Sequence, residues 1–162
     1  MEKIIGVMGP SNTSDEVLKN AYEVGKLVAL SDTVLLTGGM GGVMEEASRG
    51  AHEAGGMVLA ICPTDDKNDL NQYVDIPVVT GMKSGRNYMN ILSSDIVIAF
   101  GGVSAGTLSE IAYAVGLKRP IIFIGASDAM KGHLSEFDIE TFFFAESLKE
   151  VSNILQELVS KI

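Results

Sequence analysis

The chain has 162 residues, of which 46% are hydrophobic and 20% are charged, and its formal net charge at pH 7 is -9. This length fits one hydrophobic core, so we expect a single domain over residues 1–162, and the acidic balance argues against a nucleic-acid surface built from clustered Lys and Arg. Cys62 is the only cysteine and no apolar run is long enough to cross a bilayer, which excludes an internal disulfide, argues against a membrane anchor and favours a cytoplasmic location.

The first half of the chain alternates short apolar runs with helical patterns. Continuous Val, Ile and Leu runs, which are typical of strands buried on both faces, occupy residues 3–8, 33–37 and 57–61. Apolar side chains three and four residues apart predict helices at 15–30 and 43–54. The polar residues 62–75 are expected to form a long loop. Pro77 predicts that the apolar run 76–79 is an edge strand or the start of a strand.

The second half continues this alternation. Further helices are expected at 84–93, from the turn near residue 107 to Gly116, and from Leu148 to Ile162. Further strands are expected at 96–100, 120–124 and 141–144. The polar residues 126–138 predict a second loop.

Buried strands that alternate with helices imply a parallel sheet covered on both faces. We therefore expect an α/β fold: a single Rossmann-like three-layer domain with a doubly wound, mostly parallel sheet. Ligands bind such folds at the carboxyl ends of the strands, near a reversal of strand order. Three glycine-rich turns, which follow Met8, Thr37 and Phe100, are expected to share this edge.

The third turn has the sequence Phe100-Gly-Gly-Val-Ser-Ala-Gly-Thr-Leu-Ser-Glu110 and joins a buried strand to a helix. Backbone N–H groups at a helix N-terminus, together with the helix dipole, favour a bound phosphate. Glu110 follows within a turn of this anion site. A purely structural alternative is a capping box, in which Thr107 is the N-cap and Glu110 closes back on it.

The second turn, Gly38-Gly-Met-Gly-Gly42, has more glycine than a plain turn needs, which favours close approach of the backbone to a ligand. It is not a G-x-G-x-x-G fingerprint, and the chain lacks the lysine of a Walker A motif. Glu45 and Glu46 follow it and would repel a phosphate, so this turn is expected to contact a sugar or a base. The residues expected to contact the ligand across the three turns are Gly9, Ser11, Gly39, Gly41, Gly42, Gly101, Gly102, Ser104, Gly106 and Thr107.

Arg86 is the most informative charge. It falls in the first turn of the helix predicted at 84–93, where the helix dipole disfavours a cation by roughly 0.3–1 kcal/mol. A bound anion would reverse this cost, and the alternative is an ion pair with Asp or Glu elsewhere in the fold.

Other polar residues are interpreted as solvated. His52 and His133 have no triad partner nearby in the sequence. Asp65, Asp66 and Asp69 lack the full spacing of a calcium loop. We therefore predict no metal site.

The ordered motifs resemble the Lonely-guy-like superfamily, once labelled lysine decarboxylases. They comprise Gly38-Gly-Met-Gly-Gly-Val-Met44, the glycines Gly55-Gly56, Arg86-Asn87, and Gly101-Gly102…Gly106-Thr107-Leu-Ser-Glu110. The superfamily includes phosphoribohydrolases with the signature Pro-Gly-Gly-x-Gly-Thr-x-x-Glu. In this chain Phe100 replaces the proline and three residues, 103–105, precede Gly106 where one is usual. This longer turn is more similar to the molybdenum-cofactor-carrier branch.

The resemblance implies roles for several residues. Arg86 and Glu110 match the catalytic pair of the hydrolases: Arg86 would orient the phosphoribosyl group, and the Glu110 carboxylate would stabilise an oxocarbenium-like state or activate water. The backbone at Gly102, Gly106 and Thr107 would hold the phosphate. No metal or cofactor is required for this chemistry.

Two functions stay open, and a nucleotide-sensing module is a weaker third. One is a nucleoside 5′-monophosphate phosphoribohydrolase, which hydrolyses the N-glycosidic bond. The other is a non-catalytic carrier of molybdenum cofactor or another phosphorylated pterin or nucleotide. Either way the partner is a phosphorylated small molecule, and the resemblance also implies a homodimer or homotetramer.

Overall fold

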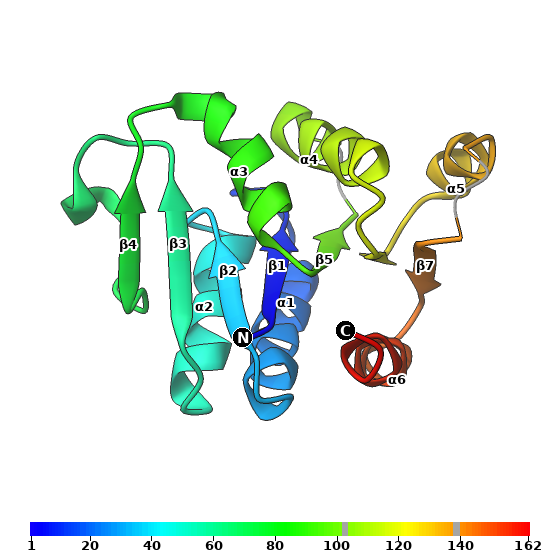
Figure 1. Ribbon diagram of the computed structural model, residues 1–162, viewed down its shortest axis with the longest axis horizontal. Coiled ribbons are helices and arrows are strands. Elements are labelled where there is room, and N and C mark those ends of the chain that lie inside the picture. Colours follow the sequence, from blue (N-terminus) through cyan, green and yellow to red (C-terminus); the bar gives the residue numbers. More distant parts are fainter. Residues whose placement is uncertain (102–103, 138–139) are drawn as a thin grey trace.

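The computed structural model describes residues 1–101, 104–137 and 140–162. Within these ranges, seven strands form one sheet in the order β4-β3-β2-β1-β5-β6-β7, with every neighbouring pair parallel (Figure 1). The predicted doubly wound α/β fold is therefore confirmed. No helix in the described part of the chain is long and apolar enough to cross a membrane.

The elements follow the predicted alternation. The strands are β1 Ile4–Met8, β2 Val34–Thr37, β3 Val58–Cys62, β4 Ile76–Val79, β5 Ile96–Phe100, β6 Ile121–Ile124 and β7 Phe142–Ala145. The α-helices are α1 Asp15–Leu30, α2 Val43–Glu53, α3 Arg86–Ser93, α4 Ala105–Gly116, α5 Asp128–Ser135 and α6 Leu148–Val159. Short 3₁₀ turns occur at η1 Lys67–Asp69 and η2 Lys83–Gly85.

Each face of the sheet contributes to its own hydrophobic cluster. Alternate strand residues, such as Ile5 and Ile98, pack with apolar residues of α1, α2 and α6. The strand residues that point to the opposite face, such as Val97 and Phe123, pack with residues of α3, α4 and α5. This explains why the strands read as continuous apolar runs: successive side chains point to opposite faces, and helices cover both.

The order of the strands reverses between β1 and β5. From β1 the chain moves outward through β2 and β3 to the edge strand β4, and then returns to place β5 on the other side of β1. Both strands therefore send their carboxyl ends to one crevice, flanked by the α3 and α4 helices that follow β4 and β5. This is the place where parallel α/β folds bind ligands.

One correction concerns the second half of the chain. The polar residues 126–138 do not form only a loop, because they contain α5, whose N-cap Ser127 accepts a hydrogen bond from the Met130 N–H at 3.2 Å. Its apolar pattern is short, and Leu134 is its one buried residue in the described range, so the periodic signal is weak. Asp138 and Ile139, at the end of the predicted loop, lie outside the described residues.

Helices α1 and α2 pack through two glycines. A Cβ on Gly25 would collide with the Ala47 carbonyl oxygen of α2, and a Cβ on Gly50 would collide with the Tyr22 carbonyl oxygen of α1. The close backbone approach holds the two helices side by side on one face of the sheet. Glycine is therefore required here for space, although it lowers helix propensity.

We predict that Gly25→Ala and Gly50→Ala each lower the free energy of unfolding by about 1–3 kcal/mol, because the added methyl must displace the facing backbone. Gly132→Ala, in α5 and without neighbours within 4 Å, is the control and should be neutral or stabilising by up to about 1 kcal/mol. Urea unfolding of the three variants measures this difference. Equal effects at all three positions would contradict the packing explanation.

Candidate functional site

Two joined cavities lie at the carboxyl ends of the strands. The larger has a volume of about 600 Å³ and the smaller about 350 Å³. The residues that line both are Ser11, Met44, Arg86, Asn87 and Gly106. The smaller cavity extends along β1 toward the start of α4, and the larger extends toward the loops that follow β3 and β4. The two volumes form one cleft at the switch point of the sheet.

Arg86 lies at the junction of the two cavities. It is the first residue of α3, and its guanidinium rests against Gly38, where a Cβ would collide with the Nη2 atom. The residue is only 8% exposed, and burial lowers the pKa of its guanidinium despite the opposing effect of Glu110. Its Nε and Nη1 atoms have no hydrogen-bond partner in the described part of the chain.

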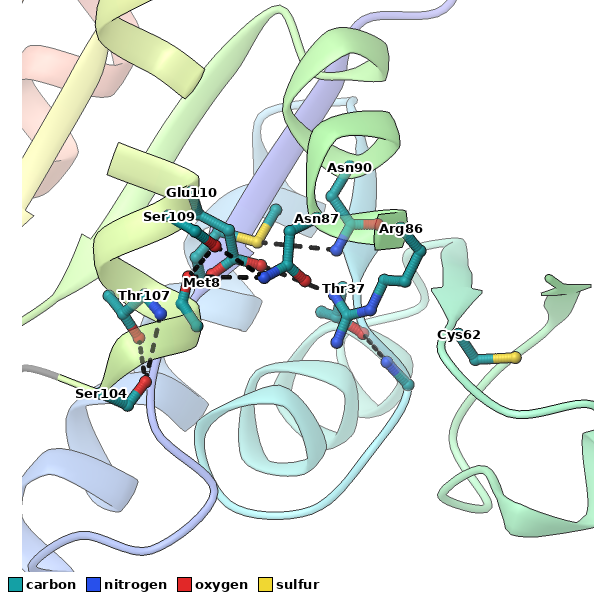
Figure 2. A network of polar contacts seen from close by, with 12 residues as sticks. Met8, Thr37, Cys62, Arg86, Asn87, Asn90, Ser104, Thr107, Ser109 and Glu110 are labelled. Atoms are coloured by element: carbon teal, nitrogen blue, oxygen red, sulfur yellow. Dashed lines mark hydrogen bonds and ion pairs between the residues drawn. The ribbon is translucent and has the colours of Figure 1, made fainter. Parts of the chain in front are cut away.

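Glu110 is the acidic partner of Arg86. Its Oε1 atom is 3.5 Å from the Arg86 Nη1 atom, and Figure 2 shows the two side chains converging between α3 and α4. Burial raises the pKa of the Glu110 carboxyl to about 7, and Arg86 and Asn90 only partly offset this effect. The contact is a charge pair without hydrogen-bond geometry, so it does not satisfy the Arg86 donors.

Asn87 connects the two helices on which this pair lies. Its Nδ2 atom donates to the Ser109 Oγ at 2.9 Å, and Ser109 Oγ in turn donates to the Gly106 carbonyl at 2.7 Å (Figure 2). Asn87 is 5% exposed, whereas the Ser109–Gly106 bond lies at the surface. The neighbouring Arg86 is thereby held at a fixed distance from the first turn of α4.

The first turn of α4 is capped by Ser104, which argues against the alternative of a capping box at Thr107. The Ser104 Oγ accepts the Thr107 N–H at 3.1 Å and lies 2.9 Å from its hydroxyl. The helix thus starts at Ala105, and Glu110 lies too far along it to close a box. The pattern Thr-x-x-Glu begins at Thr107, three residues or about one turn after the N-cap, because Ser104 takes the capping position.

Gly106 leaves the helix start open to the cleft. Among the described residues, a Cβ at this position would meet Ser104 Oγ at 3.7 Å and Asn87 Nδ2 at 3.9 Å and nothing closer. Because the first N–H groups of a helix have no intrahelical partner, they carry partial positive charge toward this space. Together with the unpartnered Arg86 donors, they form a site suited to an oxyanion.

A match to the model of the SLOG cluster4 family extends over residues 2–156. The chain belongs to this family. Membership confirms the predicted relationship to the Lonely-guy-like superfamily.

This SLOG cluster4 member is similar to three proteins over most of its length. A protein of Archaeoglobus fulgidus described as uncharacterized is 43% identical over 129 residues, which span 75% of this chain and 83% of that protein. The molybdenum cofactor binding protein of the phototrophic bacterium Rippkaea orientalis is 38% identical, with a TM-score of 0.92 over 98% of each chain. The molybdenum cofactor carrier protein of Chlamydomonas reinhardtii is 34% identical, with a TM-score of 0.91 over 99% of each chain.

The cleft brings together seven of the residues expected to form the site. Lining residues among them are Gly9, Ser11, Arg86, Ser104, Gly106, Thr107 and Glu110. Gly102 lies outside the described residues. Four further glycines do not line the cleft in the described part of the chain: Gly39, Gly41, Gly42 and Gly101.

Three of these four glycines have a packing reason. A Cβ on Gly39 would meet Leu70 and Ala60, one on Gly42 would collide with the Ser11 backbone, and one on Gly101 would collide with the Gly125 carbonyl oxygen. Gly39 and Gly42 also have φ angles of 74° and 68°. The glycine excess therefore reflects close approach within the protein, and the turn acts indirectly by fixing Ser11 and Arg86.

Several residues that line the cleft are not among those predicted from the sequence. They are Met8, Pro10, Asn12, Met40, Met44, Pro63, Thr64, Asp65, Asp69, Gly81, Lys83, Ser84 and Asn87. Asn87 carried a signal, since it adjoins Arg86 in the motif. Asp65 and Asp69 were interpreted as a solvated loop, because nothing local in the sequence shows that the loop after β3 folds against the cleft.

We predict that Glu110 makes stability depend on pH. Its pKa rises from 4.5 to about 7 on folding, so between these pH values the native state binds more protons than the unfolded state. Stability should therefore fall as pH rises through this window, on the order of 1 kcal/mol per pH unit, and level off above it.

Glu110→Gln removes this titration and is the matched variant. The unfolding free energy of the wild type minus that of the variant should decrease between pH 5 and pH 7, as measured by urea unfolding at each pH. Contributions from other groups cancel in this difference. A difference that does not change with pH would contradict the burial of an ionisable carboxyl at this position.

Proposed function

We propose that this protein binds molybdenum cofactor, or a closely related phosphorylated pterin, as a cargo and carries it without chemical change. The observation that carries the proposal is the Arg86 guanidinium, buried at the base of the cleft with Nε and Nη1 unpartnered in the described structure. An unsatisfied buried donor costs about 1–3 kcal/mol, and more when charged. A phosphate oxygen on the cargo would remove this cost.

The anion site adjoins the larger part of the cleft. The cavity of about 600 Å³ begins at Arg86 and Gly106 and provides room for the organic portion of a phosphorylated ligand. Its lining includes Met40 and Met44, whose flexible thioether side chains adapt to an irregular ligand. The similarity to proteins that bind or carry molybdenum cofactor supports the same cargo for this chain.

The longer turn before α4 also favours a carrier. In this chain Ser104 caps the helix, and its Oγ atom accepts the Thr107 N–H, which is then not free for a ligand. The hydrolase signature has fewer residues between its glycine pair and its threonine, so its phosphate would meet a different set of N–H groups. The Arg86–Glu110 pair alone therefore does not reproduce the hydrolase site.

We expect the purified protein to retain molybdenum cofactor. The protein is incubated without oxygen with cofactor released from a molybdoenzyme and then separated by gel filtration. Molybdenum is measured by mass spectrometry, and transfer is measured as activity restored to a cofactor-free apoenzyme. Arg86→Lys keeps the charge but loses the planar pair of donors, and should retain the cofactor about tenfold more weakly. Retention no greater than that of an unrelated acidic protein would contradict the proposal.

Gly106→Ala tests the anion site without disturbing the fold. The new methyl group enters the cleft beside the first turn of α4, where its neighbours are at ordinary van der Waals distances. We predict unchanged or slightly raised stability and cofactor retention weakened at least tenfold. Gly116→Ala, at the other end of α4 with no neighbour within 4 Å, is the control and should bind as the wild type. Equal retention by the two variants would place the phosphate elsewhere.

A second candidate function is favoured by Glu110. A carboxyl whose pKa is about 7 lies in the range of a general acid or base at neutral pH. If the protein is a nucleoside 5′-monophosphate phosphoribohydrolase, incubation with AMP releases adenine, which chromatography detects, and Glu110→Gln abolishes the release. We expect no release of adenine from AMP by the wild type or by Glu110→Gln. Glu110-dependent release of the free base would replace the carrier proposal with the hydrolase.

A further inference from the structure

The wall of the larger cavity opposite α4 comes from the loops after β3 and β4. Thr64, Asp65, Asp69 and Lys83 line it, and Arg86 lines the same cavity from its base. Two carboxylates therefore share one cavity with a buried guanidinium. Lys83 adds a second cation to the wall that carries the two carboxylates.

Backbone hydrogen bonds join the two loops of this wall to each other. The Gly81 N–H donates to the Thr64 carbonyl at 2.8 Å, and the Lys83 N–H donates to the Pro63 carbonyl at 3.0 Å. The loop after β3 is also tied to the glycine turn after β2, because the Asn71 Nδ2 atom donates to the Gly39 and Met40 carbonyls, each at 3.1 Å. The acidic loop is thus held in place beside the cleft.

Three aspartates in the first half of the loop after β3 have different surroundings. Asp66 is the N-cap of η1, and its Oδ1 accepts the Asn68 N–H at 2.9 Å. The carboxylates of Asp65 and Asp69 have no hydrogen bond or ion pair with the described residues, and both line the cavity. These two carboxylates are available to a ligand, whereas Asp66 is used by the protein.

A carboxylate accepts hydrogen bonds and cannot donate them, so it selects a ligand edge that carries adjacent N–H donors. The 2-amino-4-oxopyrimidine ring of a pterin has such an edge, with an amino group beside a ring N–H. Its geometry is similar to that of a guanidinium, which carboxylates bind in bidentate fashion. Arg86 cannot bind this edge, because its guanidinium and the pterin edge both present N–H donors.

We propose that the cleft binds its ligand in one direction, with the phosphate at Arg86 and the first turn of α4 and with the amino-pyrimidinone edge at Asp65 and Asp69. This inference rests on the proposed function and adds the determinant of specificity. The acidic pair accepts the amino and ring N–H groups, and it rejects rings that present a carbonyl at the same position.

A matched pair of ligands tests this orientation. Neopterin monophosphate carries the 2-amino group, and the corresponding lumazine monophosphate carries an oxygen in its place. Both are fluorescent, so the affinities of both are measured by fluorescence titration of the full-length chain. The wild type should bind the pterin at least tenfold more tightly. In Asp65→Asn/Asp69→Asn the preference should fall to within twofold, and the two single variants show which carboxylate contributes more.

Asp66→Asn is the control variant. It removes the same charge from the same loop and keeps an N-cap, because Asn caps as well as Asp. It should retain the wild-type preference for the pterin. An equal loss of preference in this variant would overturn the proposal, because it would show a general effect of loop charge. No preference in the wild type, or no binding of either ligand, would also overturn it.

The failure of this inference is distinguishable from the failure of the proposed function. If molybdenum cofactor is retained in an Arg86-dependent manner while pterin and lumazine bind equally, only the orientation is wrong. If the cofactor is not retained either, the carrier function is wrong as well.

Discussion

The burial of the Arg86 guanidinium is the constraint on which the carboxyl edge of the sheet depends. Removing a cation from water costs several kcal/mol unless nearby groups compensate. Among the residues that the structure describes, the one carboxylate that reaches it is Glu110, which is itself buried and has a raised pKa. The pair is therefore a poor stabilising element. Its persistence beside a cleft is better explained by a ligand that completes the charge arrangement than by folding.

The surrounding structure is organised to hold this cation in place. Gly38 provides the surface against which the guanidinium rests, and Asn87 couples α3 to the first turn of α4. These contacts come from segments that follow β2, β4 and β5, which meet because the strand order reverses beside β1. The fold thus collects residues that are distant in sequence at one point, and the helix dipole of α4 adds to the same positive field.

Patterns within a segment predicted much of this arrangement. Arg86 was singled out because a cation at a helix N-terminus is unfavourable, and Glu110 because it follows a glycine-rich helix start. Local patterns did not predict the N-cap of α4, for which the chain offers two suitable residues, or the helix α5. Ser104 and Thr107 are both good N-caps, and only the path of the chain after β5 decides between them. The helix α5 was missed because eight residues with one buried side chain give little periodicity.

The sequence by itself determined the alternation of strands and helices, the parallel sheet and the edge at which folds of this kind bind ligands, because hydrophobic period and glycine turns are local properties of the chain. Only the tertiary structure decided which turns line the cleft. Gly39, Gly42 and Gly101 are used for packing, and the loop with Asp65 and Asp69 forms a wall. These outcomes depend on contacts between distant segments, and local sequence patterns carry no record of such contacts.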